Sequence, residues 1–169
     1  MPIELASVTG DVLTRKEYCL GFVFSRDKRK IALMRKKRPE WQRGLLNGFG
    51  GGIGENEVPS DAMRREGYEE AGRCFDWEYA GVIAGGFWMV HVFKTFTDRI
   101  EELPTVDLDH GDERILILPI EMICYRECIS NLRYLIPLCL DSKIQFFIED
   151  NWEPESDKVG AGFVATSTR

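Results

Sequence analysis

The stretch GGIGENEVPSDAMRREGYEEAGR, residues Gly51–Arg73, places five glutamates directly behind a run of glycines. Three of them, Glu66, Glu69 and Glu70, are spaced three and four residues apart, so they project from one face if the segment is helical. Like charges at this spacing repel one another and destabilise a helix. The stretch therefore predicts a cation among these carboxylates.

A helix over residues 60–71 is predicted by its composition and by its two ends. Pro59 suits the first turn of a helix, where its missing N–H is not needed. Gly72 suits the position just after the last turn, which favours a left-handed backbone. The glycines before the helix, from Gly44 to Gly54, prevent regular packing and let the backbone approach a ligand closely. Loop and helix together predict a binding site.

The chemistry of the carboxylates favours a divalent metal ion. Carboxylate oxygens are hard ligands that suit Mg²⁺ or Mn²⁺, which bind through a few carboxylates and through substrate phosphates. A pyrophosphate is itself strongly anionic, so an acidic site needs a metal ion between the two. A bound metal would relieve both repulsions.

The rest of the chain predicts a mixed sheet with helices on its faces, an α/β fold. Apolar residues recur at helical spacing from Glu121 to Leu140, which predicts one or two helices broken near Pro137. ERILILPI is predicted to be a short buried strand. The strands are predicted at 18–25, 31–36, 77–85, 87–96, 113–120 and 143–150.

Length and composition restrict the class of protein. The 169 residues suit one domain, predicted over 1–150, followed by a polar tail over 151–169. No apolar run is long enough for a membrane helix and the N-terminus lacks a signal-peptide pattern, so we expect a cytoplasmic protein with no membrane partner. The five scattered cysteines favour reduced thiols. The net charge of −6 disfavours extended contact with nucleic acid.

The polar and glycine positions of the opening stretch follow the spacing Gly51-x5-Glu57-x7-Arg65-Glu66-x-x-Glu69-Glu70-x-Gly72. This spacing resembles the signature of the Nudix hydrolases, enzymes that cleave a nucleoside diphosphate linked to another group. The resemblance implies a Nudix-type α/β/α sandwich. Two positions that are usually apolar in the family hold Gly67 and Arg73, and a glycine inside the helix predicts slightly weaker packing on the sheet.

The resemblance also implies roles at the metal site. Glu69 and Glu70 are expected to be the main metal ligands, with the carbonyl of Gly51 as a third. Glu66 is expected to be a further ligand or the general base that takes a proton from the attacking water. Family members differ in the location of this base, so both roles stay open.

Further residues of the expected catalytic set lie around these ligands. Glu57 is expected to support the metal site or hold the loop, and Arg65 to orient Glu69 through an ion pair at i,i+4. Many members of the family supply another acid from a distant loop, and the candidates here are Asp109, Asp112 and Glu113.

The segment NGFGG, Asn47–Gly51, is similar to that of the Nudix subgroup that hydrolyses oxidised purine nucleoside triphosphates. Asn47 is therefore either a base contact or an ordinary turn residue. Arg35 and Lys36 lie in a basic cluster that either attracts phosphate or ends a solvated strand. Asn131 stands where the subgroup has an aspartate, so it could bond a base but not in the same way.

Three aromatic side chains could stack on a base, although packing is the more frequent role for each. They are Trp41, Phe87 and Trp88.

The resulting hypothesis is a Mg²⁺-dependent pyrophosphohydrolase, with Mn²⁺ as an alternative metal. It would convert a canonical or modified nucleoside triphosphate to the monophosphate and pyrophosphate. Nucleotide sugars and dinucleoside polyphosphates are the alternative substrates. A non-catalytic Nudix module that senses a nucleotide, and an isomerase on the same fold, are the rival functions. A homodimer is left open, because many Nudix proteins are dimers.

Overall fold

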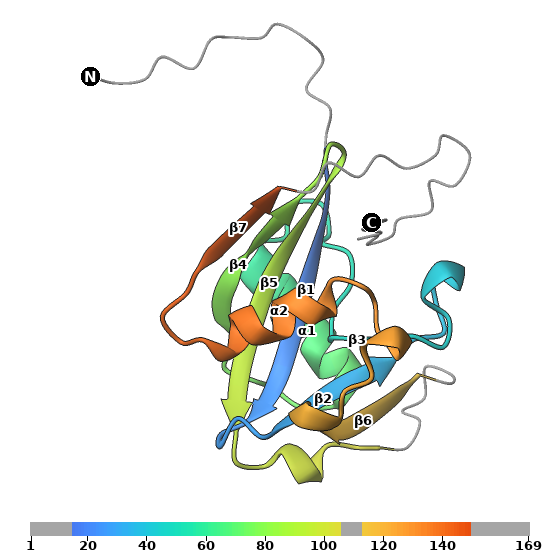
Figure 1. The fold of residues 1–169 in the computed structure, drawn as a ribbon. Helices are drawn as coiled ribbons and strands as arrows, with labels where there is room; N and C mark the ends of the chain where they lie inside the picture. Colours follow the sequence, from blue (N-terminus) through green and yellow to red (C-terminus); the bar gives the residue numbers. More distant parts are fainter. Residues whose placement is uncertain (1–14, 106–112, 150–169) are drawn as a thin grey trace, which may run out of the picture.

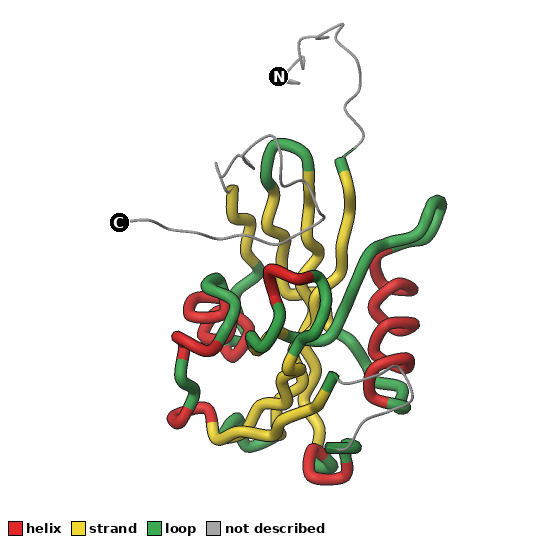
Figure 2. The backbone as a smooth tube through the Cα atoms, turned by 90° about the vertical axis from the view of Figure 1, so that its right-hand side faces the viewer, coloured by secondary structure: helices red, strands yellow, loops and turns green. Residues whose placement is uncertain are grey.

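The computed structural model describes residues 15–105 and 113–149, which form a mixed β-sheet with a helix on each face (Figures 1 and 2). This is the predicted α/β/α sandwich. The tail over 151–169 and the loop acids Asp109 and Asp112 lie outside the described residues. The seven strands are β1 (Lys16–Ser25), β2 (Lys30–Arg35), β3 (Leu46–Asn47), β4 (Glu78–Ala84), β5 (Trp88–Thr97), β6 (Arg114–Pro119) and β7 (Phe146–Glu149).

The sheet is built around the parallel pair of β1 and β5, which are in register over ten residues. The strands are ordered β3-β2-β1-β5-β4-β7. Outside this order, β6 pairs with β2 along its whole length. β1 and β2 form an antiparallel hairpin. β3 is short and pairs with the last residues of β2, so the glycine loop that follows β3 begins beside the end of that strand.

Two α-helices cover the sheet, α1 (Pro59–Ala71) on one face and α2 (Leu132–Leu140) on the other (Figure 2). α1 has the predicted ends: Pro59 is its first residue, and Gly72 adopts a left-handed conformation with φ of 63°. Four short 3₁₀ turns complete the described elements: η1 (Glu40–Gln42), η2 (Ile100–Glu102), η3 (Ile120–Met122) and η4 (Tyr125–Glu127). No helix in the described part of the chain is long and apolar enough to cross a membrane.

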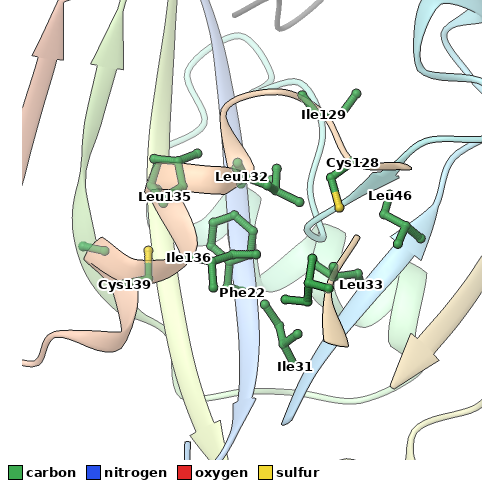
Figure 3. Close-up of a cluster of buried hydrophobic side chains, with 14 of the residues drawn as sticks. Phe22, Ile31, Leu33, Leu46, Cys128, Ile129, Leu132, Leu135, Ile136 and Cys139 are labelled. Atoms are coloured by element: carbon green, nitrogen blue, oxygen red, sulfur yellow. The ribbon is translucent and has the colours of Figure 1, made fainter. Parts of the chain in front are cut away.

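Alternation along the strands divides the apolar side chains into two cores. Phe22 of β1 packs with Leu132 and Ile136 beneath α2, as Figure 3 shows. Val23, the next residue, faces the opposite core with Met63 of α1. Successive side chains of a strand point to opposite faces, which is why a central strand buried on both faces is apolar almost throughout.

The five cysteines are free, as the sequence predicted, and all lie in the described residues. Burial raises the pKa of Cys19 and of Cys139 to about 12. Both thiols therefore stay protonated at neutral pH and pack as small apolar side chains.

The expected break near Pro137 is wrong, because α2 continues through this residue to Leu140. A proline inside a helix removes one backbone donor. Leu132, Leu135 and Ile136 are fully buried on the same helix. Burial of this apolar face stabilises α2 enough to offset the missing hydrogen bond.

The expectation that β6 is a buried strand is also wrong. Of its six residues only Ile115 is buried, and most of the others are half-buried. Among the described strands β6 pairs only with β2, so it forms an edge. An edge strand keeps more solvent contact than a central one, although both sequences can be equally apolar.

Gly67 does not leave the packing defect that the sequence predicted, because the indole of Trp77 fills the space. A Cβ at Gly67 would lie 3.0 Å from Cζ2 of Trp77. A Cβ at Gly21 of β1 would lie 2.7 Å from Cζ3 of the same ring. The indole is therefore wedged between helix and sheet, where two glycines make room for it.

The second departure, Arg73, holds the loop after β5 against the end of α1. Its guanidinium lies 3.0 Å from the carboxylate of Glu102 and also donates to the carbonyl of Arg99. An apolar residue at this position could not make these contacts. Arg73 therefore replaces an apolar contact with an ion pair that anchors η2.

We expect Gly67→Leu to lower the free energy of unfolding by ~1–3 kcal/mol, because the added side chain overlaps the indole of Trp77. The double variant Gly67→Leu, Trp77→Leu should lose less than the sum of the two single variants. Chemical denaturation of the four proteins measures both values. Strict additivity would show that the indole does not occupy this space.

Candidate functional site

The glycine loop lies against β1, and its glycines make this approach possible. The amide of Cys19 donates to the carbonyl of Gly51 at 2.9 Å, and Gly21 pairs with Phe49. Gly50 has a φ of 139°, and a Cβ there would lie 2.1 Å from the carbonyl oxygen of Cys19. No other residue fits at this position without moving the loop.

Glu70 of α1 is the most deeply enclosed carboxylate of the acidic face. One of its oxygens accepts the backbone N–H of Gly50 at 2.7 Å, and the other lies 2.7 Å from Nζ of Lys36. Burial raises the pKa of Glu70 to about 7, against the opposing effect of these two partners. The charge of this carboxylate therefore depends on a cation that stays beside it.

Glu113 joins the site through the same lysine. Nζ of Lys36 lies 3.2 Å from one Glu113 oxygen, and the amide of Lys37 donates to the other at 3.2 Å. Burial opposes the charge of Lys36, but Glu70 and Glu113 outweigh it and raise the pKa of the ammonium. Of the three loop acids named from the sequence, Glu113 is the one that the structure describes.

Arg65 organises the exposed side of the same helix. Its guanidinium donates to both oxygens of Glu57 at 2.9 and 3.0 Å and to Glu66 at 2.6 Å. It also donates to the carbonyl of Gly52 at 3.0 Å. The expected pair with Glu69 is present at 3.5 Å but is the longest of these contacts. Arg65 thus holds the loop more firmly than it orients Glu69.

Glu57 completes this attachment by accepting the N–H of Gly54 at 2.8 Å. Its hydrogen bonds to Arg65 and Gly54 lower its pKa to about 2. The sequence left two roles open for Glu57, and these contacts favour holding the loop.

The donor set suits a hard divalent cation. Glu66 lies directly beside Gly51, where a Cβ would come within 2.7 Å of the Glu66 carboxylate. Glu70 and Glu113 share the Lys36 ammonium, which shows that this space already accommodates a cation. As the side chains stand, no group of three histidines, cysteines or acids in the described ranges could hold a metal ion. A metal would therefore require some of these side chains to rearrange.

Two of the expected ligands fit less well. The carbonyl of Gly51 already accepts the N–H of Cys19. The side chain of Glu69 is half exposed. Glu66, Glu70 and Glu113 are therefore the better placed of the expected ligands.

A cavity of about 250 Å³ opens along the glycine loop, and its lining includes Gly50 and Gly51, which touch Glu70 and Glu66. Its walls include basic side chains from the end of β2, the amide of Asn47 and the glycine loop. They consist of Tyr18, Cys19, Leu20, Lys36, Arg38, Pro39, Gln42, Asn47, Gly48, Gly50, Gly51 and Gly52.

The predicted substrate contacts divide into two groups. Lys36 and Asn47 line this cavity, whereas Arg35 and Asn131 do not. Asn47 is buried, donates to Gln42 at 3.2 Å and accepts the N–H of Gly48 at 2.8 Å. Arg35 contacts the carbonyl of Gly44 and, more distantly, Glu127.

Asn131 precedes α2, and its carbonyl accepts the N–H groups of Tyr134 and Leu135. Its side chain is buried and its Oδ1 atom has no hydrogen-bond partner. Among the three aromatic residues, Trp41 and Trp88 pack against the core under α2, and Phe87 is exposed. The contacts of the two tryptophans fit the packing alternative.

Two residues of the cavity and one contact escaped the sequence analysis. Arg38 had a signal, since it belongs to the same basic cluster as Lys36. Gln42, the partner of Asn47, had none. The pairing of Lys36 with Glu70 joins residues 34 positions apart, and no local pattern reports such a contact.

The family model described as NUDIX domain matches residues 16–127, which is well over half of the chain. The chain belongs to the Nudix family. Nudix proteins act on nucleotide substrates and typically use divalent metals. A comparison with curated proteins found no match.

Solved structures share this fold at low sequence identity. The mutator MutT protein from Bacillus halodurans superimposes with a TM-score of 0.65 at 16% identity, covering 82% of this chain and 91% of that one. A Nudix hydrolase from Nitrosomonas europaea gives 0.62 at 16% identity, covering 82% and 80%. A Nudix-family hydrolase from Clostridium perfringens gives 0.59 at 18% identity, covering 76% and 97%. At these identities the likeness supports the fold alone.

Arg65→Lys should release the glycine loop while keeping the charge, because lysine cannot donate to both Glu57 oxygens and to the Gly52 carbonyl at once. We expect several-fold faster amide hydrogen exchange over residues 52–57. Arg64→Lys is the matched control, since Arg64 is exposed and contacts Asp61. Equal exchange in both variants would contradict this role.

The lowered pKa of Glu57 predicts how the stability of the protein changes at acidic pH. Its folded value of about 2 is below its ordinary value of 4.5, so its contribution to stability is complete above pH 4.5 and is lost as pH falls toward 2. The difference in melting temperature between the wild type and Glu57→Gln should therefore narrow over this range. A difference that stays constant would show that Glu57 is not paired in solution.

Proposed function

We propose that this Nudix protein is a Mg²⁺-dependent pyrophosphohydrolase that converts a canonical or modified nucleoside triphosphate to the monophosphate and pyrophosphate. The observation that carries the proposal is the position of Glu66 and Glu70. Glu66 lies beside Gly51 and Glu70 accepts the N–H of Gly50, and both glycines line a cavity whose walls also include basic side chains. Carboxylates for a metal and cations for phosphate are both needed in such a reaction.

In the proposed reaction water attacks a phosphorus atom and the bond from that atom to the bridging oxygen breaks. The leaving group takes the electron pair, and a carboxylate takes the proton of the water. Glu66 is our choice for that carboxylate or for a metal ligand, because it lies beside Gly51. Glu70 and Glu113 would be ligands, and Glu69, which is half exposed, would face the substrate side. The metal, when bound, would neutralise phosphate charge and lower the pKa of water.

The remaining residues would bind and position the substrate. Lys36 and Arg38 would contact phosphate oxygens from the cavity wall. Asn47 would bond the base only if it exchanged its hydrogen bond to Gln42 for one to the ligand. Arg35 and Asn131 are weaker proposals, since neither lines the cavity.

Several wider expectations stay predictions: a single domain over 1–150 with a separate tail, a cytoplasmic location, no extended binding of nucleic acid and the open question of a homodimer. Nucleotide sugars and dinucleoside polyphosphates remain the alternative substrates, because neither the carboxylates nor the cavity selects a leaving group.

A non-catalytic nucleotide-sensing module is the second candidate function. One observation favours it: Lys36 already pairs with both Glu70 and Glu113, so the acidic site has a cation of its own. A sensor would bind a nucleotide in the cavity and release it unchanged.

A panel of nucleoside triphosphates, nucleotide sugars and dinucleoside polyphosphates, incubated with Mg²⁺ and analysed by mass spectrometry, separates the two functions. We expect turnover of at least one triphosphate, and ¹⁸O water would identify the attacked phosphorus. Binding of a nucleotide with no turnover of any compound would favour the sensor.

With a substrate in hand, Glu66→Gln should lower kcat by about 10²–10⁴-fold if Glu66 is the general base. Glu70→Gln should lower it by orders of magnitude through loss of the metal. Glu55→Gln is the matched control, because Glu55 is an exposed acid of the same loop. Near-normal activity of Glu70→Gln would show that the metal site lies elsewhere.

A further inference from the structure

We propose that the Lys36 ammonium is an internal counter-ion that occupies the metal position of the metal-free protein, and that metal binding drives it into the adjacent cavity to contact substrate phosphate. This inference rests on the metal-site part of the proposed function. It goes further by making Lys36 a competitor of the metal and a link between metal binding and substrate binding.

The contacts of Lys36 are those of an enclosed cation. Its ammonium lies 2.7 Å from Glu70 and 3.2 Å from Glu113, and its side chain is 9% exposed. Lys30, at the other end of β2, pairs with Glu101 but is 45% exposed. Removing an ammonium from water is costly unless carboxylates surround it, so Lys36 is held in place by these two acids.

A metal ion and this ammonium would compete for the same two carboxylates. Both oxygens of Glu70 already have a partner: Gly50 holds one and Lys36 holds the other. Two cations in contact with one enclosed carboxylate would also repel each other strongly. We therefore expect a metal that binds Glu70 to displace the ammonium.

The cavity offers the displaced ammonium a new position. Lys36 is one of its lining residues, together with Arg38 from the same basic cluster. The lysine side chain is long and flexible, so its head group can move while its backbone stays in place directly after β2. In the cavity the ammonium would add to the positive charge that receives phosphate. Metal and nucleotide should then strengthen each other's binding, and by linkage the effect is reciprocal.

A purely structural role is the alternative. Lys36 would then hold Glu70 and Glu113 together in every state, and the metal would bind beside the pair. Removing the lysine would lower stability, but it would leave metal affinity unchanged or weaken it.

Calorimetric titration with Mn²⁺ alone distinguishes these roles in the wild type, Lys36→Met and Lys30→Met. We expect Lys36→Met to bind Mn²⁺ at least about tenfold more tightly, because no ammonium has to be displaced from the buried carboxylates. Lys30→Met removes the same charge at the start of β2, where the ammonium pairs with Glu101 instead, and should bind like the wild type. Equal or weaker binding by Lys36→Met would overturn the inference.

A second measurement avoids the variant altogether. The lysine side-chain ¹⁵N resonance of Lys36 should be visible in the metal-free wild type, since enclosure slows its exchange with water. Addition of Mg²⁺ should shift or broaden it, whereas an unchanged resonance during metal binding would contradict displacement. The proposed hydrolysis fails separately: tighter Mn²⁺ binding by Lys36→Met, together with no turnover of any nucleotide by the wild type, would leave the displacement intact and reject the enzyme.

Discussion

Repulsion among the carboxylates of α1 is the constraint on which the arrangement of this protein depends. Glu66, Glu69 and Glu70 lie within two turns of one helix, and burial makes the charge of Glu70 especially costly. Two cationic side chains of the protein reduce this repulsion. Arg65 neutralises the exposed side of the helix and Lys36 neutralises the enclosed side. Each of these cations also holds a second segment of the chain.

Through these second contacts, the two cations bring the loop and Glu113 to the acidic face of α1. Arg65 attaches the loop through Glu57 and Gly52. Lys36 attaches the start of β6 through Glu113, which directly precedes that strand. The loop then closes one side of the cavity. A change at either cation should therefore affect the loop, the cavity and the acidic face together.

Small residues set how closely the layers approach. The absence of a side chain at Gly50 lets the loop meet β1, and the absence of one at Gly21 and Gly67 admits the Trp77 indole between sheet and helix. Helix α1 and the glycine loop are thereby both fixed to β1. The positions of the carboxylates depend on this attachment. At Gly67, where the family usually has an apolar side chain, the indole of Trp77 fills the space instead.

Local patterns in the sequence were sufficient for most of the fold. Alternation and apolar runs predicted every described strand except the two-residue β3, and Pro59 and Gly72 predicted the ends of α1. The continuation of α2 through Pro137 was missed, because tertiary burial outweighed the local preference of proline.

The site was predictable where its residues share one segment. The spacing of Gly51–Arg73 predicted that its carboxylates and glycines belong to one site, and Glu113 was among the three candidate loop acids, while the metal chemistry stays a prediction. The partners of Lys36 and the role of Trp77 were not predictable, since each joins segments that only the folded sheet brings together. The cavity likewise depends on Gln42, which no motif marks.

A crystal grown with Mn²⁺ tests the central claim most directly, through an anomalous difference map. The account predicts a metal peak bound by Glu70 together with Glu66 or Glu113, and a Lys36 ammonium that has left Glu70 for the cavity. A peak at another place on the surface, with Lys36 still between Glu70 and Glu113, would contradict it.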